Sequence, residues 1–129
     1  MRIIQNDGGM KYSSIKDENY CTIRSIAIAF NLQFEEAYLI GKHAGRKHGQ
    51  GFHLSELMNF MFSKTPYNKI VRVRLKSNGI TIRRFIENYP IGKFICGRRG
   101  HAFAVIHGEI HDITHNTERQ IVQEAYKIN

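Results

Sequence analysis

The chain lacks several features that would place it in a specialised class of protein. Its 129 residues include no tryptophan, two prolines and two cysteines. Apolar runs such as residues 26–30 and 103–106 are far shorter than the roughly 20 residues that cross a bilayer. The first ten residues, MRIIQNDGGM, contain no apolar segment typical of a secretory signal. We therefore expect a cytoplasmic protein with one domain over residues 1–129 and no membrane partner.

The scarcity of cysteine excludes a disulfide framework. Cys21 and Cys96 are too far apart in the chain to form the usual zinc-binding pair. Three of the histidines, His43, His48 and His53, share a glycine-rich region with no carboxylate close by, so we expect no bound metal and no cofactor. The useful question is whether either cysteine is a reactive thiol. Cys96 lies in a predicted strand, which favours a buried structural thiol.

The charge of the chain is strongly positive. Lys and Arg number 19 and Asp and Glu number 11, which gives a formal net charge of +8. Such a balance favours acidic partners such as nucleic acid or an acidic protein surface, although a solvated basic face needs no partner. Arg98 and Arg99 directly precede His101 and are candidates to bind acidic residues of a substrate beside a cleft.

The first half of the chain has the periodicity of helices. Apolar residues spaced at i, i+3, i+4 and i+7 predict a first helix over residues 21–30, and similar stripes predict helices over 34–43 and 54–61. Asp17 or Asn19 would supply the N-cap of the first helix. Residues 1–16 are expected to form an extended lead-in.

The second half has the patterns of strands. Alternation predicts strands over residues 71–75, 91–96, 101–106 and 109–113, with a short helix over 81–89 capped by Thr81. Residues 97–100 would join two of the strands, and the last dozen residues are ambiguous between helix and strand. Helices followed by an antiparallel sheet indicate an α+β fold with N-terminal helices packed on a small sheet.

Three residues carry a pattern with chemical meaning. Cys21 begins the first predicted helix, where free backbone N–H groups stabilise a thiolate. His101 opens a strand, and a two-residue turn at His107-Gly108 would put Asp112 on the same face as His101, within side-chain reach. A three-residue turn would reverse this face. A thiol, an imidazole and a carboxylate supply a nucleophile, a general base and a group that orients the base.

At these residues the chain resembles the papain-like cysteine peptidase superfamily. ENYCTIRSIAIA looks like the helix that carries the nucleophile, and TIRRFIENYPIGKFICGRRGHAFAVIHGEIHD looks like the segment that leads through a Gly-His strand to the acidic residue. The likeness covers roughly residues 17–113 and is greatest to small domains such as bacteriocin-processing peptidases and phage-encoded papain-like proteins. It implies thiol-dependent cleavage of an amide or isopeptide bond in a protein or peptide. A phage-encoded protein would act in the host cytoplasm.

Two assignments remain open at this stage. Asn19 is the nearest side-chain amide before Cys21, and it would either donate to an oxyanion together with the Cys21 backbone N–H or cap the helix. The alternative function is a non-catalytic binding protein on the same fold, which uses its basic surface to engage nucleic acid or an acidic host protein. Phosphoesterase or nuclease chemistry is a third hypothesis, which rests on the sequences His53-Leu54-Ser55 and His115-Asn116-Thr117.

Overall fold

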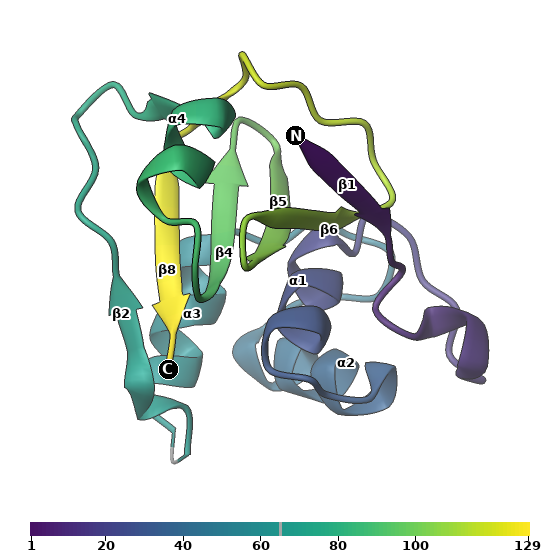
Figure 1. Ribbon diagram of the computed structural model, residues 1–129. Coiled ribbons are helices and arrows are strands. Elements are labelled where there is room, and N and C mark those ends of the chain that lie inside the picture. The colour runs from purple at the N-terminus through teal and green to yellow at the C-terminus, as the bar shows by residue number, and fades with distance from the viewer. Residues whose placement is uncertain (65) are drawn as a thin grey trace.

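The computed structural model describes residues 1–64 and 66–129 and shows an α+β fold around one six-stranded sheet (Figure 1). The α-helices are α1 (Cys21–Ala29), α2 (Phe34–Ala44), α3 (Leu54–Phe62) and α4 (Ile82–Asn88). The strands are β1 (Arg2–Gln5), β2 (Ile70–Arg72), β3 (Ile80–Thr81), β4 (Lys93–Arg98), β5 (His101–Ile106), β6 (Glu109–Asp112), β7 (Ile121–Val122) and β8 (Glu124–Ile128). Two short 3-10 helices cover Met10–Tyr12 and Tyr67–Lys69.

The main sheet is mixed rather than antiparallel. Its strand order is β1-β6-β5-β4-β8-β2, and β1 runs parallel to β6 while the other neighbours are antiparallel. The prediction of a purely antiparallel sheet is therefore wrong, because residues 2–5 of the expected lead-in form an edge strand. Strands β3 and β7 form a separate two-stranded pair.

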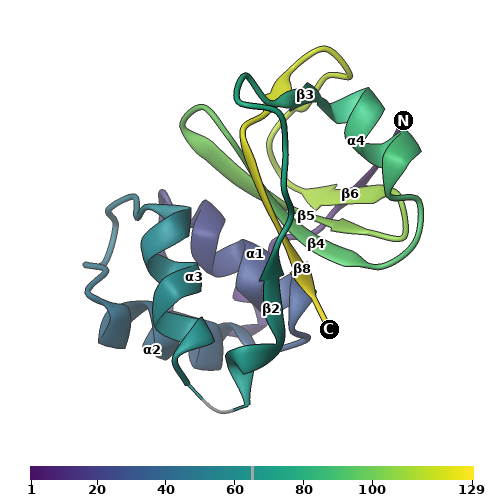
Figure 2. The same ribbon diagram turned by 90° about the vertical axis from the view of Figure 1, so that its left-hand side faces the viewer.

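The sheet separates two hydrophobic clusters. Helices α1, α2 and α3 lie on one side of the sheet and α4 lies on the other, as Figure 2 shows. The first cluster joins Ile23 and Leu57 of these helices to Ile95 of the sheet. The second joins Phe85 of α4 to the opposite face. Each strand near the centre of the sheet therefore buries both of its faces, which fixes the sheet between the two layers.

The predicted helices are confirmed to within a few residues at each end. The apolar stripe of α3 is buried at Leu54, Leu57, Met58 and Met61. Thr81 caps α4 by accepting a hydrogen bond from the Arg84 backbone N–H at 3.1 Å. Helices α1 and α2 approach closely at Gly41, where any Cβ would meet Ile23. Among the described residues, no helix is long and apolar enough to cross a membrane.

Several predicted strand ends differ from the observed ones. Strand β2 ends at Arg72, so the predicted strand over 71–75 is too long. Gly97 and Arg98 belong to β4, and the turn into β5 is the pair Arg99-Gly100. The ambiguous C-terminal segment forms β7 and β8, and β8 lies between β4 and β2.

The β5–β6 hairpin has the register that the two-residue turn predicts. His107 and Gly108 have φ values of 47° and 77°, the left-handed pair typical of a tight hairpin turn. Ile106 lies opposite Glu109, Val105 opposite Ile110 and Ala104 opposite His111, the residue before Asp112. This turn therefore decides which face of the sheet carries Asp112.

The tight turn requires a left-handed φ at Gly108. We expect Gly108→Ala to destabilise the fold by about 1–2 kcal/mol, because an alanine at a left-handed φ is strained. Gly51→Ala is the control, since a Cβ at Gly51 has nothing within 4 Å and its φ lies outside the left-handed region. Urea unfolding of both variants measures the difference in their free energies of unfolding. Equal stabilities would contradict the requirement for glycine at position 108.

Candidate active site

Cys21 is the first residue of α1, and the chain enters the helix through Tyr20 as N-cap. The Tyr20 side chain makes no capping hydrogen bond, so the predicted cap by Asp17 or Asn19 is wrong. The Tyr20 side chain therefore leaves the first-turn N–H groups of α1 uncapped. Their partial positive charge lies beside the Cys21 sulfur and favours a thiolate.

The predicted caps are engaged by a loop instead. The Asp17 carboxylate accepts hydrogen bonds from Arg46 Nη1 at 2.6 Å and from the Gly49 backbone N–H at 2.8 Å. Asn19 has a φ of 51° and donates from its side-chain amide to the Gly49 carbonyl at 3.0 Å. These bonds hold the loop after α2 against the segment that leads into Cys21.

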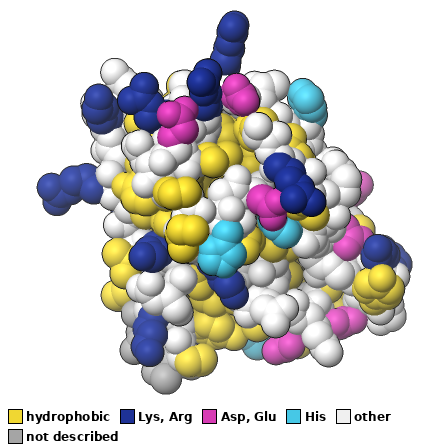
Figure 3. Space-filling view, viewed as in Figure 1, with side chains coloured by type: hydrophobic (Ala, Val, Ile, Leu, Met, Phe, Trp, Pro, Cys, Tyr) yellow, Lys and Arg dark blue, Asp and Glu magenta, His cyan; other side chains and the backbone are white. Residues whose placement is uncertain are grey.

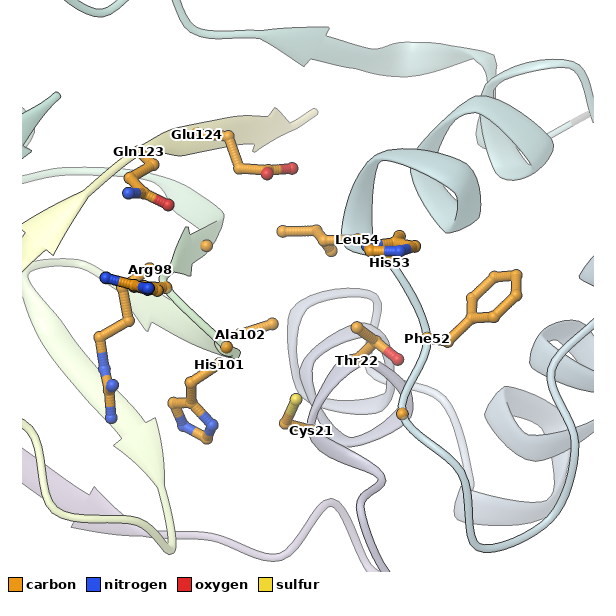
Figure 4. A pocket seen from close by; sticks show the side chains of 14 residues that line it. Cys21, Thr22, Phe52, His53, Leu54, Arg98, His101, Ala102, Gln123 and Glu124 are labelled. Carbon is orange, nitrogen blue, oxygen red and sulfur yellow. The ribbon is translucent and has the colours of Figure 1, made fainter. Parts of the chain in front are cut away.

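His101 and Asp112 are in direct contact. His101 Nε2 lies 2.6 Å from Asp112 Oδ2, so the prediction that Asp112 is within reach of this histidine is confirmed. Because Nε2 is bound by the carboxylate, the Nδ1 atom is the ring nitrogen left to face Cys21. Figure 4 shows the Cys21 side chain next to the His101 ring, and both line the same cleft.

The Asp112 carboxylate is fully buried and surrounded by donors. Oδ2 accepts from Asn116 Nδ2 at 2.8 Å in addition to its contact with His101. Oδ1 accepts from Arg24 Nη2 at 2.8 Å and from the backbone N–H groups of Ile113 and Thr114 at 2.8 and 3.2 Å. Burial acts to raise the pKa of Asp112, but these bonds and the nearby positive charges lower it to about 2.

Sequence reasoning missed two residues of this arrangement, Arg24 and Asn116. Both are buried, and each donates a hydrogen bond to Asp112. The sequence holds a signal for the first, because Arg24 is the only charged residue in the otherwise uncharged helix α1. Asn116 has no comparable signal, since it lies in an irregular segment after β6.

The thiol and the imidazole shift each other's protonation. Burial alone would raise the pKa of the Cys21 thiol, but hydrogen bonds from His101 and from the Ala102 backbone lower it overall. The positive charges of His101 and Arg24 act in the same direction. Burial alone would lower the pKa of His101, but its bonds to Asp112 and Cys21 and their negative charges raise it. The opposite shifts favour a thiolate beside an imidazolium.

A cleft of about 460 Å³ opens over Cys21 and His101. One wall comes from the start of α3 and the loop before it, and the other comes from Arg98 at the end of β4 and Arg99 in the turn that follows, as Figure 4 shows in part. Arg98 is partly held by Asn116, which accepts a hydrogen bond from its Nε at 3.1 Å. Asn19 does not line the cleft among the described residues.

The other candidate residues have different surroundings. Cys96 is fully buried, and this burial raises the pKa of its thiol well above the usual value. The described residues contain no group of three or more His, Cys, Asp or Glu side chains that could hold a metal ion. Of the two motifs considered for phosphoesterase chemistry, His53 lines the cleft, whereas the His115 carbonyl accepts from Arg98.

Comparison of the chain with protein-family models, with curated proteins and with solved structures finds no match. The function is therefore inferred from the geometry of Cys21, His101 and Asp112.

The two cysteines are expected to differ strongly in reactivity. Iodoacetamide near neutral pH should label Cys21 at least tenfold faster than Cys96, because only the first combines access to the cleft with a lowered thiol pKa. Peptide mass spectrometry after timed quenching measures both rates in one sample. Equal rates, or faster labelling of Cys96, would contradict the assignment of Cys21 as the reactive thiol.

Proposed function

We propose that this chain is a thiol-dependent hydrolase with a papain-like fold, which cleaves an amide or isopeptide bond in a protein or peptide. The observation that carries the proposal is the chain of contacts from Cys21 through His101 to the buried Asp112. Three further features support it: the nucleophile begins a helix, the base begins a strand, and a cleft opens over both. A helical layer before a sheet that carries the base is also what the papain-like resemblance implies.

The proposed reaction follows from the atoms in contact. The Cys21 thiolate attacks the carbonyl carbon of the substrate, and the electron pair of the carbonyl moves to its oxygen. As the C–N bond breaks, the His101 imidazolium gives its Nδ1 proton to the leaving amine, and a thioester with Cys21 remains. His101 then takes a proton from water as the water attacks the thioester, which releases the acid and restores the Cys21 thiolate beside the His101 imidazolium. Asp112 holds the ring in position and stabilises its charged form.

The developing oxyanion needs a donor near the sulfur. The backbone N–H of Cys21 is suited to this role because it belongs to the uncapped first turn of α1. Asn19 is the side-chain amide that the sequence offers as a second donor. Its amide donates to Gly49, so a role in catalysis would require its second N–H or a change of partner on substrate binding.

Arg98 and Arg99 support a preference for acidic substrates. Both line the cleft on the side of His101, and Arg99 is exposed in the tight turn. Glu124 lines the same cleft, where it accepts a hydrogen bond from the Tyr126 hydroxyl at 3.0 Å. A substrate carboxylate therefore meets positive charge at the turn and negative charge at β8, which favours one orientation of an acidic segment.

Substitution of the base tests the proposed hydrolase. We expect His101→Ala to reduce the neutral-pH alkylation rate of Cys21 roughly tenfold or more, since an unassisted thiol is only a few per cent thiolate at this pH. Asp112→Asn should give a smaller loss through misorientation of the ring. His111→Ala is the control, because His111 lies on the same hairpin but contacts Asn6. An unchanged rate in His101→Ala, with the fold intact by circular dichroism, would contradict the triad.

The net charge of +8 supports the second candidate, a binding protein for nucleic acid or an acidic host protein. On the face in Figure 3, however, Lys and Arg side chains are spread along the upper edge and across the surface, with acidic side chains among them. Dispersed charge of this kind gives weak attraction to polyanions without reading a sequence. We therefore favour the role of the charge in attracting acidic substrates.

A salt titration separates the two candidates. Binding to mixed-sequence RNA and duplex DNA should be weak and should disappear near physiological salt, as counterion release predicts. Exchange of Arg98 and Arg99 for serine in the same protein should change this binding little. Tight binding that persists at physiological salt and survives Cys21→Ala would favour the binding protein over the hydrolase.

A further inference from the structure

Arg24 is a buried cation one helical turn after Cys21. Its side chain is 4 % exposed, and its Nη2 lies 2.8 Å from Oδ1 of Asp112, which is 0 % exposed. The guanidinium carbon lies 4.9 Å from the centre of the Tyr20 ring. Gly8 covers its stem so closely that a Cβ there would lie 3.2 Å from the Arg24 Cα. An arginine is costly to bury, so an enclosure of this kind needs a compensating partner, which here is Asp112.

The contacts of Asp112 are divided between its two oxygens. Oδ1 accepts from Arg24 and from two backbone N–H groups, whereas Oδ2 accepts from His101 and Asn116. A carboxylate held at Oδ1 by a charged donor cannot rotate freely about its terminal bond. Arg24 therefore helps to fix the direction in which Oδ2 faces the imidazole.

We propose that Arg24 is a positioning residue of this site, which orients the Asp112 carboxylate and offsets its charge, and so sets the pH range in which Cys21 and His101 form an ion pair. The proposal rests on the proposed hydrolase. It assigns to Arg24 an electrostatic role at the nucleophile and the base in addition to its role in the fold.

The charged groups around Cys21 and His101 allow the effect of Arg24 to be isolated. The charged and titratable groups that face Cys21 and His101 are Arg24 on α1 and Asp112 on β6, with Arg98, Arg99, His53 and Glu124 lining the cleft. Arg24 is the one arginine among them that pairs with Asp112, and it is shielded from solvent. Its field is therefore screened less by salt than that of the cleft arginines.

Removal of the buried Arg24 charge should shift the pKa values of Cys21 and His101 in the same direction. It disfavours the thiolate, so the pKa of Cys21 rises. It also favours the imidazolium, because Asp112 is no longer partly neutralised, so the pKa of His101 rises as well. Both limits of the ion-pair range should therefore move to higher pH. Removal of the negative charge by Asp112→Asn has the opposite effect on His101, whose pKa should fall.

The experiment compares Arg24→Met with the unsubstituted chain. The rate of Cys21 alkylation by iodoacetamide against pH gives the thiol limit, and the ¹⁵N chemical shift of the His101 ring, assigned with His101→Ala, gives the imidazole limit. We expect both limits to rise by on the order of one pH unit in Arg24→Met. Arg24→Lys keeps the charge, so both limits should stay close to those of the unsubstituted chain. Arg24→Gln removes the charge but keeps a donor, so it replaces Arg24→Met if that variant does not fold.

Arg46→Met is the matched control. Arg46 is equally buried and pairs with Asp17 at 2.6 Å, so its loss also removes a buried ion pair, but it should leave both limits in place. If Arg24→Met or Arg24→Gln leaves both limits unchanged while the unsubstituted chain has a thiolate at neutral pH, the role of Arg24 is overturned and the hydrolase stands. If the unsubstituted Cys21 titrates as an ordinary thiol, both proposals are overturned.

Discussion

The buried Asp112 carboxylate is the group on which the rest of the site depends. An isolated charge of this kind in a protein interior would take up a proton rather than remain ionised. Here five donors from three parts of the chain compensate for the lost hydration: Arg24 of α1, His101 of β5, and Asn116, Ile113 and Thr114 of the segment after β6. The same contacts join the helical layer to the end of the sheet, so the fold and the site share one polar centre.

This centre explains how the sheet and helix α1 cooperate at Cys21. The tight turn at His107-Gly108 sets the face of β6 that carries Asp112, and Asp112 occupies one nitrogen of the His101 ring. The other nitrogen is then directed to the start of α1, where Cys21 lies. On the far side of the nucleophile, the bonds from Arg46 and Gly49 to Asp17 hold the entry to the same helix.

The parts of this arrangement that depend on local sequence could be predicted. The apolar stripe of α1 and the His107-Gly108 turn involve neighbouring residues. The register of β5 against β6 follows from that turn. The parts that depend on distant contacts could not. Arg24 and Asp112 are 88 residues apart, and β1 pairs with a strand more than 100 residues later. The predicted cap failed for the same reason, because Asp17 binds Arg46 and Gly49 rather than the nearby helix.

The proposed chemistry requires Cys21 to be a thiolate stabilised by His101 at neutral pH, and the ultraviolet absorbance of the thiolate tests this requirement without any reagent. The difference spectrum between the unsubstituted chain and Cys21→Ala, followed over a pH titration, isolates this one sulfur from Cys96 and the tyrosines. We expect thiolate absorbance that is present at neutral pH, begins below the usual pKa of a cysteine, and moves to higher pH in His101→Ala. A thiolate signal that rises only near the usual pKa of a free thiol, with or without His101, would contradict it.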